Sequence, residues 1–153
     1  MYLATIVLLM AVFPLASIAV EATVHGPAEL MMLAGKWFVF WGVGIRLLTA
    51  GIRQSLQPSF TAVSIFGIRD PDAQKIVQEL GFANVSMGLL GVLSLAFPAW
   101  LVPSALAGCV FYALAGIKHV FNARRSAKEN IATVSDLLFA LVLAGFLASQ
   151  FLG

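Results

Sequence analysis

Residues 30–52 read LMMLAGKWFVFWGVGIRLLTAGI, and this stretch points directly to a fold class. It contains no acidic residue, and its two basic residues, Lys36 and Arg46, lie ten positions apart. About 20 mostly apolar residues in a helix are enough to cross the hydrocarbon core of a bilayer. The stretch therefore predicts a transmembrane helix.

Four more stretches have the same character. They predict further spans at about residues 2–21, 73–97, 102–121 and 130–152. The chain is 61% hydrophobic and 10% charged, whereas a soluble domain has about 45–50% apolar and about 25% charged residues. We therefore predict an all-α integral membrane bundle of five transmembrane helices, forming a single domain over residues 1–153.

The first span has the length of a signal peptide, but it lacks the basic residues that normally precede the apolar part of one. We interpret it as a retained helix. Cleavage would leave four spans with the same loop orientation. The connections contain helix-start signals: Asp70 before Pro71 opens the third span, and Ser126 with Glu129 forms a capping box before the fifth.

One segment, at about residues 59–68, is too short to cross the membrane. Phe60, Val63 and Phe66 mark an apolar side, whereas Thr61 and Ser64 are more polar. This pattern predicts a short helix at the membrane surface, with a plain loop as the alternative.

Basic residues predict the orientation. The connection between the second and third spans carries Arg53, Arg69 and Lys75, and the one between the fourth and fifth carries three more basic residues. The other two connections have no Lys or Arg, and Glu21 and Glu29 flank the first of them. Because basic loops stay inside, we expect a multi-pass protein of the bacterial inner membrane, with a cytoplasmic N-terminus and an external C-terminus.

Ionisable residues within the spans are the candidates for a functional site, because each is costly in lipid. With each span centred in the bilayer, Arg46 and Asp136 lie about 7 Å and Glu79 and His119 about 10 Å to the cytoplasmic side, by the helix rise. Asn84 falls near the middle. We therefore expect these five residues to form a buried cluster, with Arg46 facing Asp136 or Glu79.

Small residues support this expectation, because they let helices approach closely in lipid and so mark faces turned toward the bundle. Three stripes at helical spacing contain three of the cluster residues, Arg46, His119 and Asp136. The stripes are Gly35, Val39, Gly42, Arg46, Thr49 and Arg53; Cys109, Tyr112, Gly116 and His119; and Glu129, Thr133, Asp136 and Ala140.

Two interpretations of the cluster remain open. In one, it lines a cavity and binds a proton, an ion or a small polar ligand; in the other, it fixes helix pairing and register. Lys36 is a separate case, about 7 Å to the outer side of the midplane by the same rise. Its stem can extend outward to Glu21 or Glu29.

Several chemistries find no support in the sequence. The single cysteine, Cys109, has no partner for thiol redox chemistry. His25 and His119 lie at opposite membrane surfaces, which disfavours a bis-histidine haem. There is no zinc-ligand spacing, P-loop or serine elbow, and the small net charge of +2 does not suggest nucleic-acid binding. We therefore assign no catalytic residue, metal or cofactor, and nothing supports an enzyme.

The run from Glu79 to Asn84, followed by Gly88 and Gly91, resembles the Glu-then-Gly-rich helix of small DoxX-like bacterial membrane proteins. The resemblance covers about the second to fifth spans and implies a four-helix core to which this chain adds an N-terminal helix. Together with Gly35-Lys36-Trp37-Phe38 and Asp70-Pro71, the same run is similar to a family of uncharacterised bacterial integral-membrane proteins. Neither resemblance implies an activity.

Three functions are therefore considered. The first is a non-enzymatic accessory or assembly protein that associates with itself or a larger membrane complex through its glycine faces. The second is a small-solute or proton-coupled transporter built on Arg46, Glu79 and Asp136, which a solvent-connected cavity at Arg46 would favour. The third is a quinone- or lipid-handling accessory of a redox complex, which a lipid-open slot lined by Trp37, Trp41 and Tyr112 would favour.

Overall fold

The computed structural model describes residues 2–26, 29–122 and 126–152, except for the side chains of Tyr2 and His25. Every element in this part of the chain is helical. In chain order the elements are α1 (Tyr2–Val7), η1 (Leu8–Val12), α2 (Phe13–His25), α3 (Leu30–Phe38), η3 (Val39–Ile45), α4 (Arg46–Leu56), η4 (Phe60–Ile65), α5 (Pro71–Leu93), η5 (Pro98–Trp100), α6 (Leu101–Val120) and α7 (Ala127–Leu152). Three of them, η1, η3 and η4, are π-helical, and η5 is a 3₁₀ turn.

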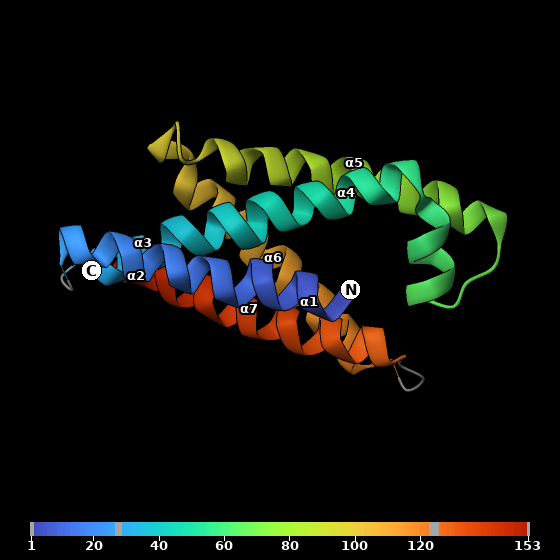
Figure 1. Cartoon of the computed structure of the whole chain (residues 1–153). Coiled ribbons are helices and arrows are strands. Elements are labelled where there is room, and N and C mark those ends of the chain that lie inside the picture. The colour runs from blue at the N-terminus through green and yellow to red at the C-terminus, as the bar shows by residue number, and fades with distance from the viewer. Residues whose placement is uncertain (1, 27–28, 123–125, 153) are drawn as a thin grey trace.

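Within the described residues, these elements form five helical rods that are long and apolar enough to cross a membrane. The first rod is α1–η1–α2 and the second is α3–η3–α4; α5, α6 with η5, and α7 are the others. Figure 1 shows α4 beside α5 at one side of the bundle and the first rod along α7 at the other. The prediction of five apolar, membrane-length helices is confirmed.

Helix ends differ from the predicted spans by a few residues, and the third span differs at its end. α5 stops at Leu93 rather than at Phe97. Phe97 has an extended backbone, φ −124° and ψ 85°, because Pro98 disfavours helical geometry in the residue before it. The expected N-cap is present at the other end of α5, where the Asp70 side chain accepts a hydrogen bond from the Asp72 N–H.

The segment after α4 contains the short helix η4, but its buried side is not the one that the sequence pattern suggested. Thr61 and Ala62 are buried, whereas Val63 and Phe66 are more than a third exposed. The Phe60 ring holds the segment against the bundle, because the Arg53 guanidinium lies 3.5 Å and the Lys128 ammonium 5.3 Å from its centroid. The position of η4 at a membrane surface stays a prediction.

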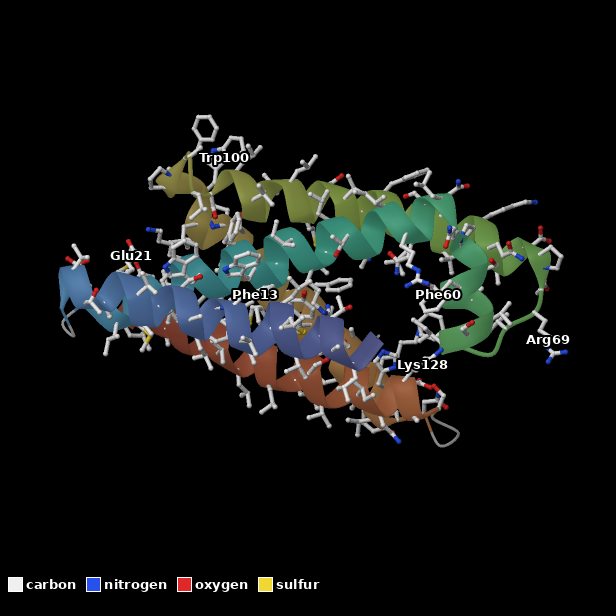
Figure 2. All side chains as sticks on the ribbon, in the orientation of Figure 1. Phe13, Glu21, Phe60, Arg69, Trp100 and Lys128 are labelled. Atoms are coloured by element: carbon white, nitrogen blue, oxygen red, sulfur yellow. The ribbon has the colours of Figure 1, made fainter. Side chains whose placement is uncertain are left out.

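Side chains distinguish the two ends of the bundle. Figure 2 shows Arg69, Phe60 and Lys128 at one end, and Glu21 and Trp100 at the other. Seven of the nine basic residues in the sequence fall in or next to the two connections at the first end. We call this end the basic end. The assignment of the basic end to the cytoplasm follows from the positive-inside rule and stays a prediction.

Glycines bring the second rod and α5 into direct backbone contact. A Cβ on Gly88 would lie 2.5 Å from the Leu48 nitrogen, and a Cβ on Gly91 would lie 2.6 Å from the Gly44 nitrogen. Real Cβ atoms do not approach backbone atoms so closely. Glycine is therefore required at this crossing, as in small-residue packing between membrane helices.

A second set of glycines receives large side chains from α7. Gly35 lies under the Phe146 ring and Gly42 under the Phe139 ring. Leu143, between these two aromatic residues on α7, is fully buried. This packing produces an apolar core where the second rod crosses α7, and it aligns the polar side chains described next.

Candidate functional site

Arg46 is at the first position of α4 and points into the bundle. Its Nη2 lies 3.1 Å from Asp136 Oδ1 on α7, and its Nη1 donates a hydrogen bond of 3.0 Å to the Tyr112 hydroxyl on α6. The guanidinium also lies 5.0 Å from the centroid of the Tyr112 ring. The side chains of Arg46 and Asp136 are only 15% and 7% exposed. Three helices thus meet at one ion pair.

The π-helical segment η3 explains how Tyr112 joins this cluster. The Arg46 N–H would bond to the Gly42 carbonyl in a regular α-helix. Here it bonds instead to the carbonyls of Trp41 and Val43. The Gly42 carbonyl accepts a short hydrogen bond from the fully buried Tyr112 hydroxyl. The change in helix geometry therefore makes a backbone acceptor part of the site.

A second polar group lies nearer the basic end. His119 Nδ1 on α6 lies 2.9 Å from Glu129 Oε1, and the Asn122 amide donates to the same oxygen at 2.7 Å. Glu129 is 3% exposed. The Ser126 hydroxyl accepts the Glu129 N–H, as the capping box predicts. The Glu129 carboxylate, however, bonds to His119 and Asn122, and so it links α7 to the end of α6.

Asp136 and Glu129 belong to the same buried stripe of α7, with Thr133 between them. The Thr133 hydroxyl donates to the Glu129 backbone carbonyl rather than to a side chain. The stripe therefore places both polar groups on one face of α7, and the Thr133 hydroxyl between them bonds to the backbone.

The expected single cluster of five residues is divided in the structure. Of the two acids expected to face Arg46, Asp136 does so and Glu79 does not. Glu79 lies on the exposed side of α5, because Gly81, Asn84 and Gly88 turn the opposite side toward the second rod.

Asn84 is buried but lies in the contact between α4 and α5. Its amide donates a hydrogen bond of 2.7 Å to Gln54 Oε1. Its carbonyl oxygen, together with the Ser55 hydroxyl, is buried without a hydrogen-bond partner in the described part of the chain.

The stripe predicted on the second span also divides. Gly35, Val39 and Gly42 are buried, whereas Thr49 and Arg53 are exposed. The stripe leaves the core after Arg46 because the π-helical turns of η3 rotate the residues that follow, relative to a regular α-helix.

Lys36 forms the polar group at the opposite end, and its partner is Glu21. Its Nζ lies 2.7 Å and 2.9 Å from the two Glu21 carboxylate oxygens. The Trp37 indole donates to Glu21 at 2.6 Å, and the Trp41 indole donates to the Ser17 hydroxyl at 3.0 Å. These bonds attach α2 to the second rod. The indole contacts were not anticipated from the sequence, since the aromatic pattern alone names no acceptor.

An apolar plug separates the Arg46 cluster from the Lys36 group. Val39, Val43, Leu143 and Phe146 lie between them and are fully buried. Within the described residues, the polar groups around Arg46 reach as far as Tyr112 and Gly42, and Ser104, nearer the start of α6, is a separate buried polar side chain.

The larger of two described cavities is a groove between the first rod and α7. It has a volume of about 520 Å³, and its lining is almost entirely apolar, with Met10, Phe38 and Phe139 along it and Asn130 and Ser135 as its polar residues. It is open along one side. The slot that would favour the third function is not this groove, because Trp37, Trp41 and Tyr112 are not among the residues that line it.

A second cavity, of about 270 Å³, lies at the opposite end beside Glu21, Glu29 and Lys36.

The thiol of Cys109 lies 3.5 Å from the Ala140 carbonyl oxygen, within the contact between α6 and α7. Within the described residues, no group of three or more His, Cys, Asp or Glu side chains could hold a metal ion.

These features define a multi-pass helical membrane protein with a buried ion pair. Over residues 1–151 the chain matches the family of unknown function DUF6790, and it belongs to that family. No curated protein and no solved structure matches the chain. The family fits the predicted uncharacterised family, whereas the DoxX-like core stays a prediction.

Proposed function

We propose that this protein is a non-enzymatic accessory component of the bacterial inner membrane, which acts by assembling with itself or a larger membrane complex. In this proposal, the cluster of Arg46, Tyr112 and Asp136 is a structural lock that fixes the register of three helices. One observation supports this proposal: the buried ion pair finds its hydrogen-bond partners within the protein. Arg46 donates to Asp136 and to Tyr112, and Tyr112 donates in turn to the Gly42 carbonyl.

Glycines of the second rod and α5 are used for contacts within the bundle. Gly44 and Gly91 are in contact with each other, and Gly35 and Gly42 are covered by aromatic rings of α7. The first rod is a better candidate for the assembly surface, because it is the most apolar and the least buried of the five. Val20, on α2, is 72% exposed.

A pair of bulky substitutions tests this proposal. Val20→Trp places a large ring on the exposed side of the first rod, and Leu114→Trp places the same ring on α6 at a residue that is 64% exposed. After gentle extraction from its own membrane, the unsubstituted protein should show a native mass above the 16.3 kDa of one chain. Val20→Trp should shift the mass toward the single chain, and Leu114→Trp should not.

Recovery of all three proteins as single chains would contradict the assembly role. So would an equal effect of the two substitutions, since the first rod would then have no special part in assembly.

A proton-coupled carrier is the second candidate, and the stripe of Glu129, Thr133 and Asp136 favours it. Intramembrane carboxylates with His and Arg partners are typical of proton pathways. Against it, the plug around Val43 and Leu143 closes the other half of the bundle.

Proton flux into liposomes, followed with an entrapped pH-sensitive dye, distinguishes the two candidates. The accessory role predicts the same flux as in empty liposomes. A flux that Asp136→Asn abolishes, in a protein that remains folded, would establish the carrier instead.

A further inference from the structure

The groove between the first rod and α7 has the length of one bilayer leaflet. Its lining on α7 extends from Asn130 to Val142, and its lining on the first rod extends from Leu3 to Ala11. Twelve helical residues correspond to about 18 Å at a rise of about 1.5 Å per residue. Half of a hydrocarbon core of about 30 Å is about 15 Å. The groove therefore reaches from the membrane surface to about the midplane.

The size of the groove suits a hydrocarbon chain. Spread over about 18 Å, a volume of about 520 Å³ leaves room for a hydrocarbon chain along the floor of the groove. A helix with its side chains is about 10–12 Å in diameter and would rest across the open side of the groove.

Polarity and charge then favour one class of lipid. Asn130 lies at the end of the groove nearest the basic end, and Lys128 is one helical turn before Ile131, which lines the groove. Basic residues beside a membrane surface attract anionic lipid head groups. An isoprenoid quinone also has a hydrocarbon tail, but its neutral head gains nothing from these charges.

We propose that this groove binds one acyl chain of an anionic phospholipid from the leaflet at the basic end, with the phosphate beside Lys128 and Asn130. This site goes beyond the accessory role, because it requires neither assembly nor a partner protein. It makes the first rod and α7 two walls of a lipid site.

Retention of lipid measured by native mass spectrometry tests the site. The full chain is equilibrated in nanodiscs with equal amounts of phosphatidylglycerol and phosphatidylethanolamine, then released and weighed with its bound lipid. Phosphatidylglycerol should be retained in preference, at one molecule per chain.

Matched substitutions locate the acyl chain. Val134→Trp fills the groove from a residue that is 59% exposed and should remove most of the retained lipid. Leu141→Trp adds the same ring on α7 at a 69% exposed residue outside the groove and should leave retention unchanged.

A charge substitution locates the head group. Lys128→Gln should reduce the preference for phosphatidylglycerol about fivefold, the usual effect of one basic residue near an anionic surface. Lys75→Gln, also at the basic end but on α5, should change the preference by less than about twofold, by the same scale. Neither residue is in the apolar core, so both variants should fold.

Three results would overturn the proposal. They are equal retention of the two phospholipids, equal loss of lipid in Leu141→Trp and Val134→Trp, and displacement of the phospholipid by ubiquinone in a parallel sample at the same concentration.

Discussion

The Tyr112 hydroxyl lies between a cation and a backbone carbonyl, and both are in the membrane interior. It accepts from Arg46 and donates to Gly42. A hydroxyl can do both at once, so one side chain serves two groups that water cannot reach there. At the scale of single residues, Tyr112 is thus the connection between the ion pair and the π-helical backbone.

Tyr112→Phe removes that connection and leaves the ring in place. We expect the free energy of unfolding to fall by about 1–3 kcal/mol, because a buried acceptor loses its donor. Unfolding in mixed detergent micelles measures this loss. Ser86→Ala is the control, since the exposed Ser86 hydroxyl bonds only within its own helix, and it should change stability by less than about 0.5 kcal/mol. Equal effects of the two substitutions would contradict the role of Tyr112.

The sequence narrowed the partner of Arg46 to Asp136 or Glu79, because depth and helical face can both be counted along a helix. Tyr112 was predicted to lie on a stripe of the fourth span but not to bond to Arg46. An uncharged hydroxyl does not stand out in the sequence as a charged side chain does. Glu79 was misplaced because its depth matched but its helical face did not.

At the scale of helices, the crossing of α4 and α5 depends on glycine. The backbone atoms of Leu48 and Gly44 approach Gly88 and Gly91 more closely than any Cβ allows. The apolar spans and their glycines were visible in the sequence. The π-helical turns were not, since no residue pattern in the sequence marks them.

Gly88→Leu should separate α5 from the second rod. We expect a loss of about 1–3 kcal/mol in the free energy of unfolding, as for overpacked cores. Gly145→Leu is the matched control, because a Cβ at Gly145 meets nothing within 4 Å. Thermal unfolding in detergent compares the two, and a control as unstable as the test variant would rule out the close crossing as the cause.

At the scale of the whole molecule, the basic end and the opposite end define an orientation. Arg53, Arg69 and Lys128 lie at the first, and Glu21 with Glu29 at the second. The positive-inside rule predicts that the basic end lies in the cytoplasm.

Single-cysteine labelling tests this orientation. In a Cys109→Ala background, Glu29→Cys should react with an impermeant maleimide on intact cells, because the predicted orientation puts residue 29 outside. Ile68→Cys should react only after permeabilisation. Both residues are exposed. The reverse pattern of labelling would invert the proposed topology.

If the Arg46–Asp136 pair locks the bundle, as we propose, a double-mutant cycle will measure the coupling between the two residues. Arg46→Met and Asp136→Leu, each alone, should lower the free energy of unfolding by about 3–5 kcal/mol, because each leaves a buried charge without its main partner. Combined in one variant, the two substitutions should recover most of the lost free energy of unfolding, since an apolar pair of similar volume replaces the ions. A double variant whose loss equals the sum of the two single losses would contradict the lock.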